Sequence, residues 1–318
     1  MIKQITIINH LNESLELELA SPEKSGLAVL SVTGLGPPSA TINTTEGSGI
    51  DGSIFDSAYA ENRNVVFTIK YLDPIEENRH KVYKYFPIKK NIRMIFKTTI
   101  RTVELEGYVE SNEALIFSSD TGSTISIICP RPYPKEIAAK NESFGQIEPY
   151  LSFELLNPTD TVGYIPNQYS DIVEEGSTEY DTHIVETLST DHTKNFINSG
   201  EIEVGLLINL DFSGPATNIR VSNMDQGIMY IDTSKLADKN GNTISITNGD
   251  RLTIDTRTGS KKITFTRNAE TWPIFNCISK DFLWLYLIPG SNTISYAADT
   301  GVDNITLNLN YETYYQGV

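Results

Sequence analysis

Short runs in which apolar and polar residues alternate recur along most of this sequence. In the first run, Leu15, Leu17 and Leu19 alternate with Glu16 and Glu18, which is the pattern of a strand with one buried face and one solvated face. The same pattern predicts strands over residues 64–71, 125–129, 206–212, 262–265, 292–297 and 304–311. A chain with so many short strands is expected to be mainly β.

Two Asn-Gly pairs, Asn240-Gly241 and Asn248-Gly249, lie between such runs. Asn-Gly is the pair favoured by type I′ hairpin turns, in which both central residues take a positive φ. The sequence therefore predicts tight hairpins at both places.

One helix is predicted, over about residues 74–86. Asp73 is expected to cap it, Pro74 to take its first position, Glu76 to complete a capping box and Pro87 to end it. The apolar residues expected to pack against a sheet are Ile75, Val82, Tyr83 and Phe86.

The chain has 318 residues, enough for two domains. Three prolines, Pro130, Pro132 and Pro134, deny a sheet its N–H donors, which indicates a boundary. We expect an N-terminal β-barrel or split barrel with one helix over residues 1–135, and an antiparallel β-sandwich over residues 136–318. Within the second domain, residues 164–199 are rich in Asp, Glu, Thr and Ser and are expected to form long acidic loops.

The net charge of −16 is uneven: residues 1–132 carry 13 basic and 16 acidic groups, and residues 133–318 carry 12 and 25. No Lys or Arg occurs between residues 141 and 193, so direct DNA binding is disfavoured. The longest apolar run, residues 282–288, is too short to cross a bilayer. The first residues lack the pattern of a signal peptide, so we expect synthesis in a cytoplasm and no membrane insertion.

The sequence lacks the residues that known catalytic and cofactor motifs require. The prolines of Gly34-Leu35-Gly36-Pro37-Pro38 remove the N–H donors that a phosphate loop needs. No GxSxG, HExxH or Walker sequence occurs, and the SxxK at Ser21 lacks its companion motifs. Cys129 and Cys277 have no CxxC spacing and are expected to be buried and unreactive. We therefore expect no catalytic residue and no cofactor, although a glycosidase carboxylate pair stays open among so many acids.

Two clusters of oxygen and nitrogen ligands are candidate metal sites. Asp238, Asn240 and Asn242 have the spacing of a calcium loop, but Thr243 stands where glycine is required, which favours a hairpin tip. His183 and His192 lie among carboxylates without helical spacing, which favours a solvated acidic loop. No metal is predicted.

Aromatic residues near the C-terminal end raise glycan binding as an alternative. Trp284 and Tyr286 alternate with leucines, which favours a strand buried on both faces. Trp272, followed by Pro273, is the freer candidate for stacking on a sugar.

Several segments carry a resemblance to a known family. VTGLGPPSATIN, DGSIF, RNVVFTIKYLD, NRHKVYKYFPIKK, GYVESNEALIFS and ISIICPRPY, together with GDRLTIDTRTG, LWLYLIPGSNTISYAADTG and the closing YYQGV, resemble the distal tail proteins of long-tailed siphophages. The resemblance implies an N-terminal split barrel, a C-terminal galectin-like sandwich and a structural role.

The same resemblance implies a homo-hexameric ring at the distal end of the virion tail, assembled in the bacterial host cytoplasm. Its partners would be the tail tube protein on one side and baseplate and receptor-binding proteins on the other. In that family the glycine-rich region after residue 33 contributes to contacts between subunits. The interface candidates here are Gly34, Gly36, Pro37, Pro38, Asp51, Gly52 and Phe55. The alternatives are a carbohydrate-binding module of a tail tip, with Trp272 in contact with the sugar, and a tail-associated glycan hydrolase.

Overall fold

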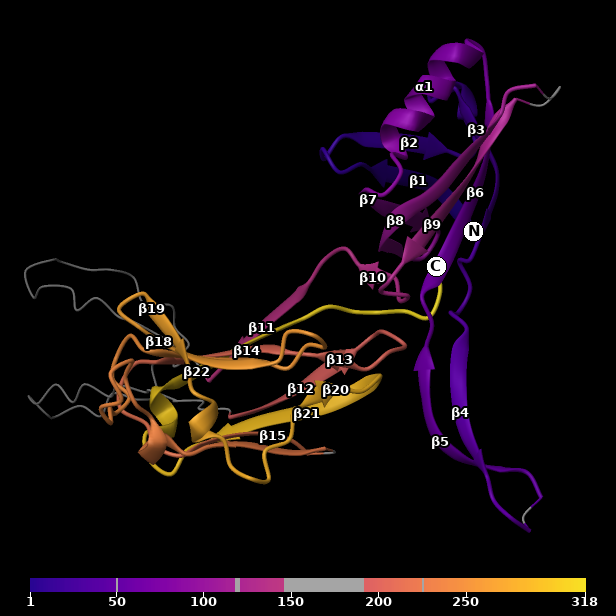
Figure 1. The fold of residues 1–318 in the computed structure, drawn as a ribbon. Helices are drawn as coiled ribbons and strands as arrows, with labels where there is room; N and C mark the ends of the chain where they lie inside the picture. The colour runs from indigo at the N-terminus through magenta and orange to yellow at the C-terminus, as the bar shows by residue number, and fades with distance from the viewer. Residues whose placement is uncertain (50, 118–120, 146–191, 225) are drawn as a thin grey trace, which may run out of the picture.

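The computed structural model describes residues 1–49, 51–117, 121–145, 192–224 and 226–318. Its sheets are antiparallel throughout the named strand pairs, and its buried apolar side chains form two separate clusters. Figure 1 shows the two bodies side by side, with a long two-stranded arm projecting from the first. Within these described ranges, the prediction of a mainly β chain with one α-helix is confirmed.

The first body is an eight-stranded sheet with the order β2-β1-β7-β8-β9-β6-β3, to which β10 adds beside β8. Its strands alternate buried and exposed residues, and the inward set includes Phe67, Phe96 and Ile127. The strand bounds are β1 Ile2–Ile8, β2 Ser14–Glu18, β3 Leu27–Thr33, β6 Arg63–Tyr71, β7 Asn91–Thr98, β8 Thr102–Leu115, β9 Gly122–Cys129 and β10 Lys135–Glu136. A 3-10 turn, η1, spans Pro22–Lys24.

The helix α1 spans Ile75–Tyr85, so its predicted position is confirmed, but the predicted capping box is wrong. Pro74, with extended backbone, is the N-cap residue, and no side chain caps the helix. Val82 and Phe86 pack in the core as expected, whereas Ile75 and Tyr83 remain partly exposed. The buried polar residue on this face is Asn78, whose amide donates to the carbonyl of Leu72.

Between β3 and β6 the chain leaves the sheet as a β-hairpin, formed by β4 (Ala40–Glu46) and β5 (Ser53–Ala60). The glycine-rich region after residue 33 therefore contains two regular strands. The hairpin pairs with no other strand among the described residues, and Figure 1 shows it extending away from the end of the body that carries α1. We call residues 39–61 the arm.

The second body is a sandwich of two sheets around its own apolar core. The six-stranded sheet has the order β11-β22-β14-β17-β18-β19 and the four-stranded sheet the order β12-β21-β15-β16. Their bounds are β11 Lys140–Phe144, β12 Thr193–Asn198, β14 Leu207–Phe212, β15 Ile219–Asn223, β16 Gly227–Ile231, β17 Arg251–Asp255, β18 Lys262–Arg267, β19 Glu270–Pro273, β21 Gly290–Ala297 and β22 Ile305–Tyr311. A small extra pair joins β13 Val204–Gly205 to β20 Tyr286–Leu287, and 3-10 turns span η2 Thr233–Lys235, η3 Phe275–Cys277 and η4 Val302–Asn304.

All seven predicted strand runs lie on strands of the structure, namely β2, β6, β9, β14, β18, β21 and β22. The predicted loop over residues 164–199 is wrong at its end, because residues 193–198 form β12, and residues 164–191 lie outside the described part. The strand expected to be buried on both faces around Trp284 is also wrong. Leu285 and Leu287 point inward, while Leu283 is 53% exposed and Tyr286 is 37% exposed.

The predicted turn type is wrong at both Asn-Gly pairs. Gly241 and Gly249 take positive φ, but Asn240 and Asn248 do not. A two-residue turn with positive φ at both positions occurs instead at Asn268-Ala269, between β18 and β19. Alanine gives no sequence signal for a left-handed turn.

Cys129 and Cys277 are both buried and free, as expected, and burial raises the pKa of each thiol to about 11. Among the described residues, no helix has the length and apolar character that crossing a membrane requires.

Candidate functional site: an exposed arm and its anchored base

The two faces of the arm differ in chemistry. Residues paired across the hairpin share a face, so the register places Ala40 with Ala60, Ile42 with Ala58, and Thr44 with Phe55. This face is apolar over most of its length, and we call it the apolar arm face. Ile42 is 64% exposed and Phe55 is 62% exposed, so it is uncovered in the isolated chain.

The opposite face carries a row of side-chain hydrogen bonds between the strands. Asn43 donates to Ser57 at 2.9 Å, and Thr45 donates to Asp56 at 2.5 Å. Nearer the base, Thr41 donates to Glu61 at 2.6 Å, and this bond is the main cause that lowers the pKa of Glu61. Ile54 also points to this side, because it pairs with Thr45.

A β-bulge sorts the side chains onto these faces. The register shifts between Asn43, which pairs with Ser57, and Thr44, which pairs with Phe55, so Asp56 has no partner residue on β4. If β5 continued without a bulge, period-two alternation would place Asp56 and Ile54 on the apolar side. The bulge instead places Phe55 beside Thr44 and leaves Asp56 to bond Thr45.

The base of the arm is fixed by a close backbone approach at Gly34. Gly34 has φ +80°, and a Cβ atom added there would lie 1.9 Å from the carbonyl oxygen of Asn64. Only glycine accommodates both the left-handed backbone and this contact. A Cβ atom added at Gly36 would meet nothing within 4 Å, and Pro37 and Pro38 then lead into β4.

Arg63, the first residue of β6, holds this base. Its side chain donates to four backbone carbonyls: Nε to Pro132 at 2.5 Å, Nη1 to Gly34 at 2.8 Å and Gly36 at 2.6 Å, and Nη2 to Gln316 at 2.6 Å. Arg63 is 3% exposed, and no ion pair joins it to a carboxylate among the described residues. Burial lowers the pKa of its guanidinium.

Residues 314–318, which we call the strap, return from the sandwich to the first body. Tyr315 packs in the core of that body, and the guanidinium of Arg101 lies 4.1 Å from the centre of its ring. Arg101 also donates to the carbonyl of Gly317 at 2.9 Å, and the amide of Val318 donates to Leu35 at 3.0 Å. The strap therefore reaches the segment between Gly34 and Gly36 from which the arm begins.

The seven residues predicted as interface candidates lie at two ends of the arm. Gly34, Gly36, Pro37 and Pro38 form its base, while Asp51 and Gly52 lie in the turn at its tip and Phe55 lies on β5. Arg63 and Ile42 were not among the predicted residues. The alternation within residues 40–46 could have indicated Ile42, but nothing local marks Arg63, whose partners are distant in sequence.

The junction between the two bodies contains a cleft of about 530 Å³, lined by residues 130–133, residues 202–205 and the loop after β17. At its edge, Tyr314 donates to Glu312 at 2.5 Å, and burial and this bond raise the pKa of Tyr314. Lys135 lies 3.3 Å from Glu312 and 3.9 Å from the buried Glu104 of β8. These ion pairs link the sandwich to the first body.

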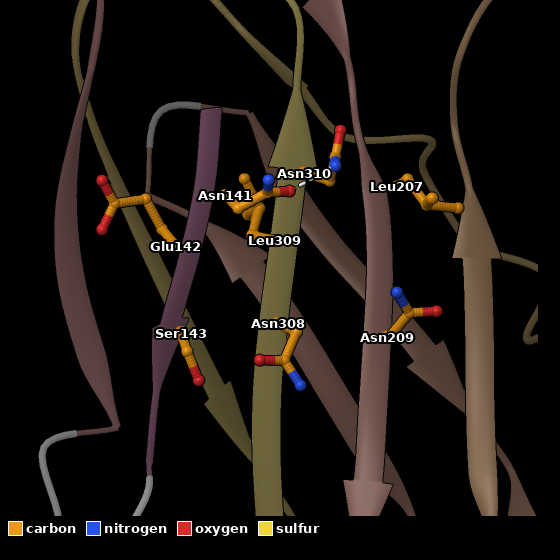
Figure 2. A pocket seen from close by; sticks show the side chains of 8 residues that line it. All are labelled: Asn141, Glu142, Ser143, Leu207, Asn209, Asn308, Leu309 and Asn310. Carbon is orange, nitrogen blue, oxygen red and sulfur yellow. Dashed lines mark hydrogen bonds between the residues drawn. The ribbon is translucent and has the colours of Figure 1, made fainter. Parts of the chain in front are cut away.

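A shallow hollow of about 270 Å³ lies on the outer side of β11, β22 and β14. Its lining includes Asn141, Asn209, Asn308 and Asn310 (Figure 2). Its lining has no aromatic ring on which a sugar could stack.

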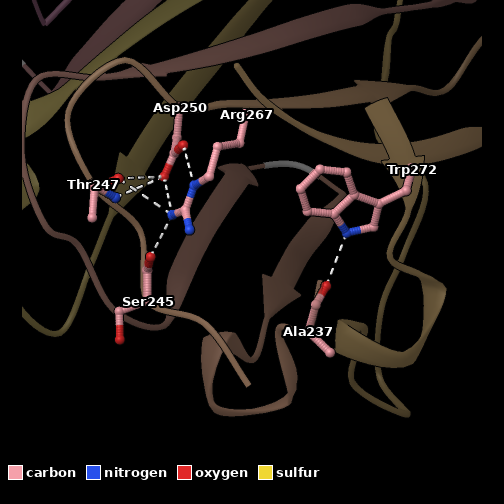
Figure 3. Close-up of polar contacts among 6 residues, drawn as sticks. All are labelled: Ala237, Ser245, Thr247, Asp250, Arg267 and Trp272. Carbon is pink, nitrogen blue, oxygen red and sulfur yellow. Dashed lines mark hydrogen bonds and ion pairs between the residues drawn. The ribbon is translucent and has the colours of Figure 1, made fainter. Parts of the chain in front are cut away.

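Trp272, the glycan candidate, is half-buried at the edge of the sandwich core. Its indole N–H donates to the carbonyl of Ala237 at 2.9 Å (Figure 3), and its ring lies edge-on to Phe265. Glycan binding by Trp272 stays a prediction.

The structure describes the first candidate metal cluster completely and the second only in part. Asp238 accepts hydrogen bonds from the amides of Asn240 and Asn242 in a hairpin tip. His192 contacts Tyr296 and Asp303, while His183 lies outside the described residues. In the described part of the chain, no group of three or more His, Cys, Asp or Glu side chains is arranged to hold a metal ion.

Comparison with known proteins finds no matching family model and no matching curated protein. Among solved structures, the chain is similar to the SPP1 Dit (gp 19.1) protein, described as a paradigm of the hub adsorption apparatus in phages that infect Gram-positive bacteria. The TM-score is 0.59 at 9% identity, over 98% of each chain. A structure of the phage P2 baseplate in its activated conformation with Ca gives a TM-score of 0.43 at 12% identity, over 100% of each chain. The chain therefore shares its overall fold, from one end to the other, with the SPP1 Dit protein.

Proposed function

We propose that this chain is a distal tail protein, a structural component of the tail tip of a long-tailed phage or prophage. The observation that carries the proposal is the similarity to the SPP1 Dit protein over 98% of both chains. At 9% identity, that similarity is one of fold. The second support for the proposal is the resemblance of the segments around GLGPP and YYQGV to the distal tail proteins of siphophages. The role is structural and not catalytic.

In this role the chain forms a homo-hexameric ring that joins the tail tube protein to baseplate and receptor-binding proteins. The ring is assembled in the bacterial host cytoplasm and becomes part of the virion tail. The first body forms the ring and the galectin-like sandwich faces outward, with acidic groups flanking a central channel that repels DNA. Cyclic closure requires two different patches that recur around the axis.

The apolar arm face is the patch that we assign to contact with a second copy of the chain. A two-stranded hairpin is marginally stable by itself in water, and this one exposes Ile42 and Phe55 on one side. Packing against the neighbouring copy would bury these side chains. The nearly balanced charge of residues 1–132 suits such close contact between identical subunits.

The test is the solution mass of the 318-residue chain by light scattering, followed by negative-stain imaging for six-fold rings. The wild-type chain should form rings, and Phe55→Ser should shift it to monomer. Ile54→Ser is the matched control, because Ile54 is the adjacent residue on the opposite face, is 54% exposed and should leave the ring intact. A wild-type chain that stays monomeric at every concentration would contradict the proposal.

A further inference from the structure

The arm, the segment between the two bodies and the strap meet at a single side chain. Arg63 bonds the carbonyls of Gly34 and Gly36 at the arm base, Pro132 in the connecting segment and Gln316 in the strap. These four bonds use four of the five N–H groups of a guanidinium. We propose that Arg63 is a positioning residue that sets the direction of the arm and couples it to the sandwich.

The chemistry of the contact supports this assignment. A buried arginine ordinarily pairs with a carboxylate, but the four bonds of Arg63 go to backbone carbonyls. Main-chain oxygens keep their place when side chains change, so the planar fork of Arg63 fixes the relative positions of three backbone segments. A lysine has three donors on one flexible stem and cannot reproduce four bonds in this geometry.

The strap is a second connection between the two bodies, beside the segment around Pro132. Glu136 N–H donates to the carbonyl of Thr313, and Tyr315 N–H donates to that of Pro134, so the two connecting segments run together. Glu201 of the sandwich accepts from the amide of Gln316 and lies 3.5 Å from Arg101. A displacement of the sandwich would therefore move Gln316, one of the four acceptors that hold Arg63.

The inference rests on the proposed function for its purpose, because the arm direction matters most when the arm must meet a second copy. The contacts of Arg63 lie within one chain, so the direction of the arm can be measured in the single chain. Two variants test it. Arg63→Lys keeps the charge and removes the fork, and deletion of residues 316–318 removes the acceptor on Gln316 while retaining Tyr315 in the core.

The experiment places spin labels on Ser53→Cys at the arm tip and Ile100→Cys on the first body, in the 318-residue chain under monomeric conditions. Ile100 is 86% exposed, and Cys129 and Cys277 are buried. The distance distribution should be narrow in the labelled parent, and both Arg63→Lys and the deletion should at least double its width. Hydrogen exchange at the amide of Val318 should become at least tenfold faster in Arg63→Lys.

Arg93→Lys is the control, because Arg93 lies on β7 in the same body, and its side chain is 37% exposed and 3.7 Å from Glu104. It should change neither the distance distribution nor the exchange at Val318. An unchanged distribution and unchanged exchange in Arg63→Lys would overturn the inference, even if that variant failed to form rings. If the wild-type chain forms no ring but Arg63→Lys widens the distribution, the proposed function fails and the positioning role stands.

Discussion

The guanidinium of Arg63 and the carbonyl oxygen of Gln316, 253 residues apart in the sequence, lie 2.6 Å apart in a partly buried hydrogen bond. This bond joins β6 of the first body to the strap at the C-terminal end of the described residues. The same side chain also bonds the base of the arm. The arm and the sandwich therefore share one anchoring residue.

Replacing Arg63 by methionine should destabilise the first body by about 3 kcal/mol, because several carbonyls would lose a charged donor in a buried place. Urea unfolding followed by circular dichroism measures the change. Arg251→Met is the control: Arg251 forms a partly exposed ion pair with Asp211, and such pairs contribute about 1 kcal/mol or less. Equal effects of the two substitutions would contradict the structural role of Arg63.

Gly34→Ala and Gly36→Ala should differ sharply, although the residues are two positions apart. Alanine at Gly34 would meet the carbonyl of Asn64 and would have to keep φ +80°, which should destabilise the fold by about 2–4 kcal/mol. Alanine at Gly36 meets nothing within 4 Å and should be nearly neutral. Thermal unfolding of the two variants compares them directly, and similar melting temperatures would count against the close approach at Gly34.

Ala269→Gly should stabilise the chain by about 0.5 kcal/mol. Ala269 has φ +66° in the turn between β18 and β19, where a Cβ atom is unfavourable, and this strain exceeds the entropy that glycine loses on folding. Asn268→Gly in the same turn should bring no gain, because asparagine tolerates φ +51°. The midpoints of denaturant unfolding distinguish the two, and a loss of stability in Ala269→Gly would refute the prediction.

Acid should weaken the sandwich through Asp250, which lies 2.6 Å from Arg267 (Figure 3). Burial by itself raises the pKa of Asp250, but hydrogen bonds from Arg267 and Thr247 lower it more, so the folded carboxyl titrates below its ordinary pKa of 3.8. The unfolded chain then binds the proton more readily. The stabilisation is complete above pH 3.8 and is lost as the pH falls through the folded-state pKa.

The unfolding free energy of the wild-type chain, measured between about pH 6 and pH 2, should therefore decline at the acid end. Asp250→Asn should start lower at pH 6 and decline less steeply. Asp303→Asn should leave the slope unchanged, because the side chain of Asp303 is 64% exposed and its recorded ion pair is with His192. A steeper acid decline in Asp250→Asn would show that the sign of the shift is wrong.

The strands and the helix were predictable because their signals are local. Alternation of Leu15 and Leu17 with glutamates requires one buried face wherever the strand packs, and β2 has that pattern. The capping box at Glu76 failed because Pro74, and not Asp73, is the N-cap residue. The prediction that both faces of the segment around Trp284 are buried failed, because one face is exposed to solvent. Which face is covered depends on the packing of the neighbouring sheet.

The sequence by itself determined the fold class, the helix and the glycine-rich origin of the arm, because these depend on residues a few positions apart. Only the tertiary structure decided that Phe55 shares a face with Ile42, since a bulge at Asp56 sets the register. It also decided that Arg63 joins the arm base to Gln316. A contact across 253 residues leaves no periodic or compositional trace in a single sequence, because only the packed chain brings its two groups together.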